Sequence, residues 1–296
     1  MPRLPFRKYH GLGNDFIVLD GITRADLPVD RLADPNTAAR ICERHVGVGA
    51  DGLLLVLPAT SVSARARMRV INADGSEPEM CGNGIRCVAK ALHDHLGFGG
   101  AERITIDTGA GPLACDLTRG DDGRVRSVRV DMGRPRLERR TLPMTGEGEH
   151  VDGVIEAADT ELRWTAVSMG NPHIVTFVED PAVDLHALAE HLGPAMEHHP
   201  LFPRRTNVEL VRLGPAGAET WVWERGCGIT QACGTGACAV AVAAAATDRH
   251  PEGEDLAVIL PGGTLSILVA PDRSRVWMDG PAVEVFSGEL ELEAFG

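Results

Sequence analysis

The chain has 296 residues, a length that suggests two domains of ordinary size. Hydrophobic residues make up 44% of it and charged residues 24%, as in soluble globular proteins, and the net charge of −13 argues against nucleic acid or an anionic membrane as a partner. The N-terminal segment shows no apolar signal region, and the alanine-rich run over 237–246 is too short to span a bilayer. We therefore expect a cytoplasmic protein whose seven cysteines are reduced.

The first half of the chain predicts a run of strands with two helices. One helix should start at Asp34-Pro35 and end near Gly47, because aspartate caps helices and proline suits the first helical position. A second helix should start just after Cys81 and reach Leu96. Alternating or Val- and Leu-rich segments predict strands at about 53–57, 66–72, 102–108, 112–118 and 125–131.

The second half repeats the elements of the first. A shorter helix should run from Asp184 to Gly193, and another should follow Cys233 through to Ala246. The strands of this half are predicted at about 207–213, 218–224, 256–260, 264–270 and 274–279.

Short motifs recur in the same order in the two halves. The segment 13–18 (GNDFIV) resembles 170–175 (GNPHIV), and 81–84 (CGNG) resembles 233–236 (CGTG). Asn72 lies nine residues before the first cysteine, and Glu224 lies nine residues before the second. Landmarks in one order at nearly constant spacing predict an internal duplication. We expect the equivalent motifs to face each other across a cleft between the two halves.

Cys81 and Cys233 each directly precede a predicted helix. A helix N-terminus carries partial positive charge, which is expected to lower the pKa of a thiol and favour the thiolate. If the two sites face each other, a carboxylate fits between the helix ends and its α-carbon lies between the sulfurs. One thiolate then removes the α-proton and the opposite thiol returns one to the other face, while backbone amides stabilise the developing charge. This chemistry requires neither a cofactor nor a metal.

The remaining cysteines and the lysines point to competing interpretations. The other five cysteines are expected to be small, inert core residues: Cys42, Cys87, Cys115, Cys227 and Cys238. Cys227, Cys233 and Cys238 cluster in sequence, but their spacing fits no usual zinc pattern. A pyridoxal-dependent racemase would need Lys8 or Lys90 for its Schiff base, because the chain has no other lysine.

Taken together, the motifs resemble the diaminopimelate epimerase family over nearly the whole chain. The segments that carry the resemblance, in order, are 11–16, 72–76, 79–84, 170–173, 206–209, 224–226, 232–236 and 279–282. The resemblance implies a PLP-independent isomerase that interconverts LL- and meso-2,6-diaminoheptanedioate, towards lysine and cell-wall precursors, and a homodimer. It also implies an α/β (α+β) fold of two pseudo-symmetric domains, each a strongly curved, mostly antiparallel sheet around a central helix.

The resemblance also assigns domains and site residues. With the C-terminal strand returning to the first domain, the expected domains are 1–129 plus 279–296, carrying Cys81, and 130–278, carrying Cys233. His173 and Glu224 match positions thought to tune the two cysteines. The residues that match substrate-holding positions are Asn14, Asn72, Gly82, Asn83, Asn171, Asn207, Glu224, Arg225, Gly234 and Thr235. Gly52 departs from the family, because some members have a glutamine there that contacts the substrate.

Three other functions remain open at this point. A proline-racemase-like enzyme would share the fold and the cysteine pair, and a phenazine-pathway isomerase would share the fold alone. A non-catalytic amino-acid-binding protein would bind the same ligand without exchanging its α-hydrogen. The Glu224-Arg225 pair favours a substrate with a second charged end, since Glu suits an ammonium group and Arg a carboxylate.

Overall fold

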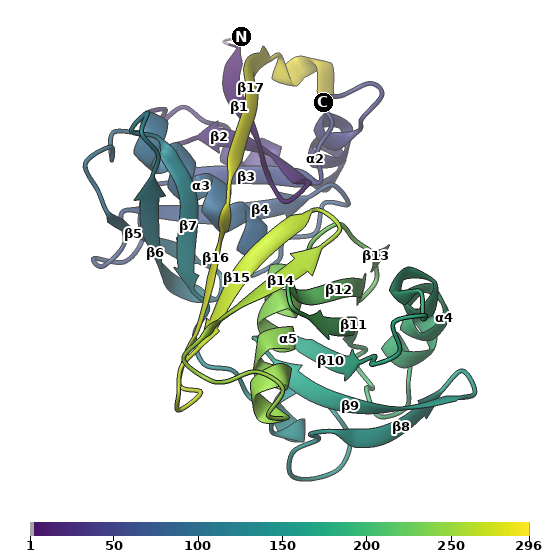
Figure 1. Cartoon of the computed structure of the whole chain (residues 1–296). Helices are drawn as coiled ribbons and strands as arrows, with labels where there is room; N and C mark the ends of the chain where they lie inside the picture. Colours follow the sequence, from purple (N-terminus) through teal and green to yellow (C-terminus); the bar gives the residue numbers. More distant parts are fainter. Residues whose placement is uncertain (1–2, 296) are drawn as a thin grey trace. The chain divides into compact units, whose positions relative to one another are not determined.

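The computed structural model describes residues 3–295, which divide into two compact units. Unit 1 comprises Met1–Val130 and Gly280–Gly296, and unit 2 comprises Asp131–Asp279. Figure 1 shows the elements of both units in sequence colours. Within residues 3–295, no helix has both the length and the apolar character needed to cross a membrane.

Unit 1 is a sheet with one long helix and three short ones. Its strands are β1 (Leu4–Gly11), β2 (Asn14–Asp20), β3 (Gly52–Leu57), β4 (Ala66–Asn72), β5 (Arg103–Thr108), β6 (Gly111–Arg119), β7 (Val125–Asp131) and β17 (Val283–Leu290). Its helices are α1 (Val29–Leu32), α2 (Pro35–Cys42), α3 (Gly82–His95) and the 3₁₀ helix η2 (Leu292–Phe295). The strands pair in the order β17-β1-β2-β3-β4-β5-β6-β7, and only β2–β3 and β4–β5 are parallel.

Unit 2 repeats this plan. Its strands are β8 (Gly153–Ala157), β9 (Thr160–Ser168), β10 (Pro172–Phe177), β11 (Asn207–Gly214), β12 (Gly217–Glu224), β13 (Gly228–Ile229), β14 (Asp255–Leu260), β15 (Gly263–Val269) and β16 (Val276–Pro281). Its helices are α4 (Leu185–Glu197), α5 (Gly234–Ala246) and the 3₁₀ helix η1 (Arg139–Thr141). The order is β8-β9-β10-β11-β12-β14-β15-β16, and β13 adds to β12.

The two pairing patterns match strand for strand. In unit 2, β10–β11 and β12–β14 are the parallel pairs, and they stand where β2–β3 and β4–β5 stand in unit 1. Even the register agrees, because Phe16 pairs with Gly52 and His173 pairs with Asn207. The predicted fold class, a duplicated and mostly antiparallel α+β fold, is confirmed.

A buried helix lies at the centre of each sheet. Every residue of α3 from Gly82 to His93 is buried, as are 11 of the residues of α5. Helix α3 contacts β1 to β6, and α5 contacts the corresponding strands β9 to β12, β14 and β15. A helix that is apolar all round is stable only when the protein surrounds it, which is why the alanine-rich α5 is a core helix.

Two predicted helix ends were wrong. Helix α2 ends at Cys42 rather than near Gly47, because the Glu43 carboxylate accepts the backbone N–H groups of His45 and Val46 and turns the chain out of the helix. Helix α4 continues through Gly193 to Glu197. A Cβ on Gly193 would lie 2.5 Å from the Trp223 indole, so this glycine allows close packing and does not end the helix.

Candidate active site

Cys81 occupies the N-cap of α3 in unit 1. Its backbone is extended, and its sulfur accepts the N–H of Gly84 at 3.3 Å. The first turn of α3 packs closely against β3, because a Cβ on Gly84 would lie 3.0 Å from Leu54 Cδ2. The thiol is partly exposed, and the amides of the first helical turn point towards the same end of the helix.

Hydrogen bonds fix the residues around this helix start. Asn83 Nδ2 donates to Asn14 Oδ1 at 3.2 Å, and Asn14 Nδ2 donates to Asp51 Oδ2 at 2.7 Å. The fully buried Arg86 guanidinium donates to Asn83 Oδ1 and to the Gly82 carbonyl, both at 3.0 Å. Of the predicted residues, Asn14, Gly82 and Asn83 therefore lie at the start of α3 beside Cys81.

Asn72 lies at the end of β4, opposite Gly52 in the β3–β4 register. Its Nδ2 donates to Ser76 Oγ at 2.9 Å. A Cβ on Gly52 would lie 2.7 Å from the Ile71 carbonyl oxygen, so a larger residue at this position would require the local backbone to shift.

Cys233 occupies the equivalent N-cap of α5 in unit 2. Its sulfur accepts the N–H of Gly236 at 3.4 Å and lies 3.5 Å from Thr235 Oγ1. Unlike Cys81, this residue is buried. The two cysteines therefore share one backbone setting and differ in their access to solvent.

The expected lowering of the thiol pKa was wrong for Cys233. Burial raises its pKa well above the ordinary value, and the Glu224 and Glu209 carboxylates raise it further. The hydrogen bonds from Thr235 and from the Gly236 amide act in the opposite direction but are outweighed. Desolvation and two nearby negative charges disfavour a thiolate more than the helix N-terminus favours it.

A chain of hydrogen-bonded side chains leads from the core of unit 2 to Cys233. His173 and Glu209 are fully buried, and Glu209 Oε1 lies 2.6 Å from His173 Nδ1. His173 Nε2 lies 3.0 Å from Asn171 Oδ1, and Asn171 Nδ2 donates to Thr235 Oγ1 at 3.3 Å. Thr235 in turn contacts the Cys233 sulfur. The predicted residues Asn171, His173, Thr235 and Cys233 therefore form one connected group.

Glu224, Asn207 and Arg225 lie where β11 begins and β12 ends. Thr230 Oγ1 donates to Glu224 Oε1 at 2.6 Å, and burial raises the pKa of Glu224 despite that hydrogen bond and the nearby His173. Asn207 Nδ2 donates to the Pro172 carbonyl at 2.8 Å, and its Oδ1 accepts the backbone N–H of Arg225 at 2.9 Å. The Arg225 side chain is exposed. Unit 2 thus presents a carboxyl group and a guanidinium group on adjacent residues.

Sequence reasoning missed Glu209 as a site residue. The sequence feature that could have revealed it is a single acidic residue within the otherwise apolar strand segment 208–211. The first half of the chain has Leu54 at the equivalent position. A charged residue is rarely fully buried unless it is paired. Here the partner is His173.

The remaining cysteines divide into two kinds. Cys42, Cys87, Cys115 and Cys238 are buried, as expected, and burial raises the pKa of the first three to about 12. Cys227 is exposed on the turn after Arg225, so its predicted core position was wrong. It lies on the turn between β12 and β13, where its N–H donates to the Glu224 carbonyl at 3.0 Å.

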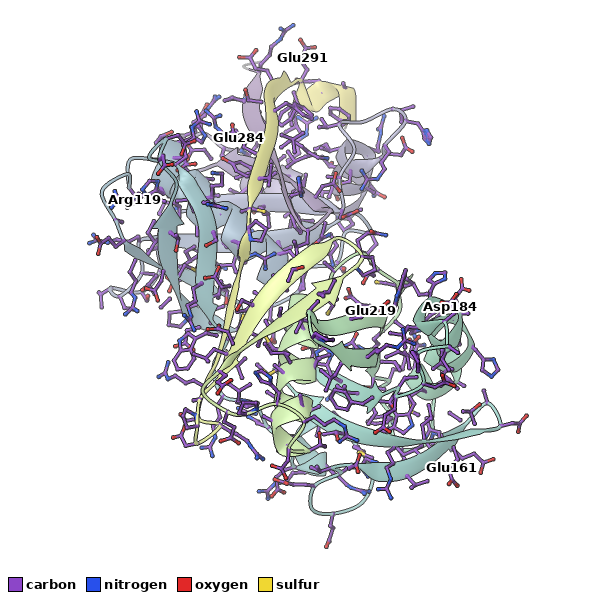
Figure 2. All side chains as sticks on the ribbon, viewed as in Figure 1. Arg119, Glu161, Asp184, Glu219, Glu284 and Glu291 are labelled. Carbon is purple, nitrogen blue, oxygen red and sulfur yellow. The ribbon has the colours of Figure 1, made fainter. Side chains whose placement is uncertain are left out.

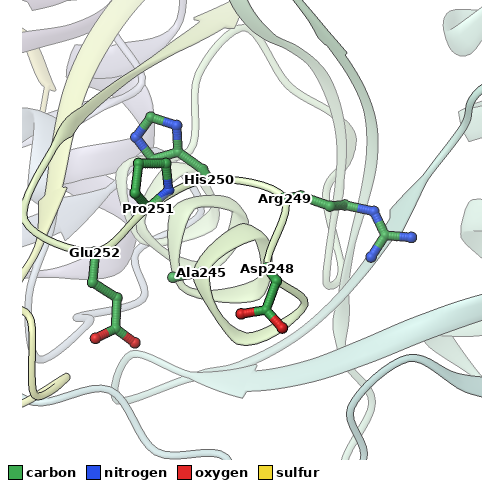
Figure 3. A pocket seen from close by; sticks show the side chains of 6 residues that line it. All are labelled: Ala245, Asp248, Arg249, His250, Pro251 and Glu252. Atoms are coloured by element: carbon green, nitrogen blue, oxygen red, sulfur yellow. The ribbon is translucent and has the colours of Figure 1, made fainter.

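A pocket of about 540 Å³ lies at the C-terminal end of α5 (Figure 3). Its lining consists of Ala245, Asp248, Arg249, His250, Pro251 and Glu252. Cys233 caps the opposite end of α5, and thirteen residues of helix at about 1.5 Å each separate the pocket from the sulfur by roughly 20 Å. Two of its charged groups are already paired, Arg249 with Asp152 and Glu252 with Arg273. The pocket is therefore separate from the cysteine site.

Comparison with known sequences identifies the family. The sequence model of the family described as diaminopimelate epimerase matches residues 6–138 and 165–285. The diaminopimelate epimerase of Moorella thermoacetica is 50% identical over 290 residues, which cover 97% of this chain and 99% of that protein. The diaminopimelate epimerase of Synechococcus elongatus is 48% identical over 295 residues, covering 98% and 99%.

Solved structures show the same fold at much lower sequence identity. A hydroxyproline epimerase from Agrobacterium vitis superposes with a TM-score of 0.70 at 17% identity, covering 98% of this chain and 91% of that one. A phenazine biosynthesis protein from Bacillus anthracis gives 0.67 at 18% identity, covering 98% and 100%. With the sequence matches extending over nearly its whole length, the chain belongs to the diaminopimelate epimerase family and is an enzyme of the isomerase class.

Proposed function

We propose that this enzyme interconverts LL- and meso-2,6-diaminoheptanedioate with Cys81 and Cys233 as its acid–base pair, in the synthesis of lysine and peptidoglycan precursors. The observation that carries the proposal is the matched placement of the two cysteines. Each caps the buried central helix of one duplicated unit and accepts an N–H from a glycine three residues on. The names of relatives about 50% identical over the whole chain support the substrate.

The proposed reaction moves one proton on and one off the α-carbon. The substrate α-carboxylate binds the first-turn amides at Gly82-Asn83 and Gly234-Thr235, which stabilise the charge that develops as the α-C–H bond breaks. A thiolate takes that proton, and the opposite thiol donates its proton to the other face of the same carbon. The thiol becomes a thiolate and the thiolate a thiol, so charge is balanced and the centre is inverted.

The raised pKa of Cys233 supports an assignment of protonation states to the two cysteines. Burial and two carboxylates favour the protonated sulfur at this position. We propose that Cys233 enters one direction of the reaction as the thiol and that Cys81 enters it as the thiolate. The reverse direction then starts from the swapped protonation states.

The second amino-acid end of the substrate would meet Glu224, Arg225, Asn72, Asn207, Asn14 and Asn171. A carboxylate suits the ammonium group, and a guanidinium suits the distal carboxylate. These polar groups exceed what one zwitterionic centre needs. A single amino acid such as proline should therefore be a poor substrate.

Both lysines support a mechanism without pyridoxal phosphate. The Lys8 amine is buried and paired with Asp15 at 2.6 Å, and the Lys90 amine is paired with Asp94 at 2.9 Å. An amine held in a buried ion pair is poorly placed to form a Schiff base.

The deciding experiment follows the α-hydrogen of LL-diaminopimelate by NMR in heavy water. Exchange with formation of the meso isomer is expected, and kcat/KM should far exceed the values for proline and lysine in the same assay. Arg225→Met should weaken substrate binding with the fold preserved. Comparable kcat/KM values for diaminopimelate and proline would instead indicate a broader racemase, and binding without exchange would indicate a binding protein.

Oxidation tests whether both sulfurs reach one carbon. Two thiols that serve opposite faces of one α-carbon should come close enough to form a disulfide. We expect oxidised enzyme to lose activity, to show a Cys81–Cys233 crosslink by mass spectrometry, and to recover with reductant. An oxidised sample that stays fully active without reductant would contradict the paired-sulfur mechanism.

We also propose that the enzyme is a homodimer. The support is strand β17, which exposes Val283, Val285 and Phe286 and pairs with β1. Exposed apolar side chains on a sheet strand favour association. Sedimentation should give a dimer for the parent enzyme and a monomer for Phe286→Glu, and a monomeric parent would refute the proposal.

A further inference from the structure

Glu209 has a setting that the proposed mechanism does not use. It is fully buried in β11, and its Oε1 faces His173 Nδ1 at 2.6 Å. Its second oxygen, Oε2, has no hydrogen-bond partner within the described structure. A buried carboxylate with one bare oxygen is costly, so it is expected where it serves a function.

The position equivalent to Glu209 in unit 1 is apolar. The β2–β3 register pairs Phe16 with Gly52, and the β10–β11 register pairs His173 with Asn207. Two residues further along, Leu54 therefore corresponds to Glu209. The helix glycines agree, since a Cβ on Gly84 would meet Leu54 at 3.0 Å and a Cβ on Gly236 would meet Glu209 Oε1 at 2.9 Å. The fold itself thus accepts an uncharged pair here.

The hydrogen bonds indicate what the carboxylate does. The ring nitrogens of His173 face Glu209 Oε1 and Asn171 Oδ1, and an ionised Glu209 pairs with a ring that carries hydrogen on both nitrogens. The Asn171 amide is then oriented with Nδ2 towards Thr235 Oγ1, which leaves the Thr235 hydroxyl hydrogen for the Cys233 sulfur. In this arrangement His173 Nε2, Asn171 Nδ2 and Thr235 Oγ1 each donate in the direction of Cys233, whereas His173 Nδ1 donates to Glu209.

We propose that Glu209 is a positioning residue that keeps a hydrogen on both nitrogens of His173 and thereby directs the Thr235 hydroxyl at the Cys233 sulfur. The inference deepens the proposed function and rests on it, because a hydrogen bond from the Thr235 hydroxyl stabilises the Cys233 sulfur when that sulfur becomes the thiolate. Three further charged or titratable groups lie around Glu209: His173 on β10, Glu224 on β12 and Cys233 at the start of α5. Without Glu209, a neutral His173 would allow the Asn171 side-chain amide to rotate by half a turn. Asn171 would then donate to His173, and the direction of the hydrogen bonds to Thr235 and Cys233 would be reversed.

The direct test is ¹⁵N NMR of the histidine ring on the protein alone, with His173→Phe identifying the His173 signals. At neutral pH we expect both His173 nitrogens to be protonated in the parent enzyme and one to be unprotonated in Glu209→Gln. A bare ring nitrogen in the parent, or an unchanged spectrum in Glu209→Gln, would overturn the proposal. Because no substrate is present, this result is independent of the reaction assigned to the enzyme.

The kinetic test separates positioning from folding. Glu209→Gln should lower kcat/KM by about 10- to 100-fold, as expected for a hydrogen bond to a charged group, mostly through kcat. Glu209→Leu, which copies Leu54 of unit 1, should lose activity to the same extent while keeping the parent Tm. The matched control is Glu219→Gln on β12, which is half exposed and labelled in Figure 2. A Glu209→Leu enzyme with a lowered Tm and proportionate loss of activity would show a purely structural role, as would full activity in Glu209→Gln.

Discussion

The two units share a backbone and differ in the charges placed upon it. Around Cys81, the equivalent positions on the sheet are Phe16, Leu54 and Asn72, all uncharged. Around Cys233, they are His173, Glu209 and Glu224. The strand order, the N-capping cysteine and the amide on the sulfur are the same in both.

The comparison shows which parts of a duplicated site are free to diverge. Backbone hydrogen bonds at a helix N-terminus depend only on helix geometry, so both copies keep them. The protonation state of a thiol depends on burial and nearby charge, and these changed without disturbing the fold. Such a difference favours one of the two states in which the pair carries a single proton, because two identical sulfurs would hold that proton equally.

The largest loss of activity is expected when either cysteine sulfur is replaced. Cys81→Ser and Cys233→Ser should each lower kcat by at least about 10²- to 10⁴-fold, since a serine hydroxyl is a far weaker acid–base group than a thiol. Steady-state epimerisation assays measure this, with the exposed Cys227→Ser as the control expected to keep its activity. If one of the two variants turns over near the parent rate, the sulfurs are not an acid–base pair.

The pH dependence of alkylation would sharpen the electrostatic contrast. The pKa of Cys233 is raised by burial, Glu224 and Glu209, so iodoacetamide should label it slowly at neutral pH and faster only in alkaline solution. Removing a negative charge stabilises the thiolate, so Glu224→Gln should move labelling of Cys233 to lower pH. Mass spectrometry follows Cys81 and Cys233 separately. Labelling of Cys233 that matches or exceeds Cys81 at pH 7 would contradict the comparison.

The glycine in the first turn of each helix offers a smaller, matched test. Gly236→Ala would press its Cβ to 2.9 Å from the buried Glu209 Oε1, whereas Gly84→Ala would meet the Leu54 methyl group at 3.0 Å. Displacing a hydrogen-bonded carboxylate costs more than displacing a methyl group. We expect Gly236→Ala to lose roughly tenfold more kcat/KM than Gly84→Ala, a factor of ten being about 1.4 kcal/mol. Equal losses of kcat/KM in the two variants would mean that Glu209 has no particular role in the reaction.

The smallest effect should be equal in the two units. Asp34 caps α2 through the Thr37 N–H, and Asp184, which is labelled in Figure 2, caps α4 through the N–H groups of His186 and Ala187. Both helices are peripheral to the cysteines. Asp34→Ala and Asp184→Ala should each lower Tm by a few degrees and leave kcat unchanged. A change in kcat in only one of them would show that the scaffold, as well as the site, has diverged.

The local sequence pattern predicted most of the helices and strands, because these elements depend on properties of residues that are close together in the chain. Strand β4 was predicted at its observed bounds, 66–72, since alternating side chains report one buried face. The end of α2 was not predicted, because a side chain in the following turn, Glu43, captures the amides that would have continued the helix. Glycine at position 193 predicts a helix end, but the helix continues there because Gly193 packs against Trp223 of β12.

For the proposed site, the sequence predicts residues but not their protonation states. Both cysteines and their glycines follow from repeated motifs, because a helix N-terminus has the same geometry wherever it occurs. The asparagines follow from the resemblance to the family. The exposed place of Cys227 and the role of Glu209 did not follow, because nothing local distinguishes a buried position from an exposed one there.

The sequence by itself determined the duplication, the strand periods, the helix starts and the two capping cysteines, all of which depend on neighbours within a few residues. Only the tertiary structure decided that Cys233 is desolvated between Glu224 and Glu209, and that His173 faces an acceptor on each side. Burial and charge around a group depend on strands distant in the chain. For that reason the helix start alone predicted a thiolate at Cys233, and the packed unit favours a thiol.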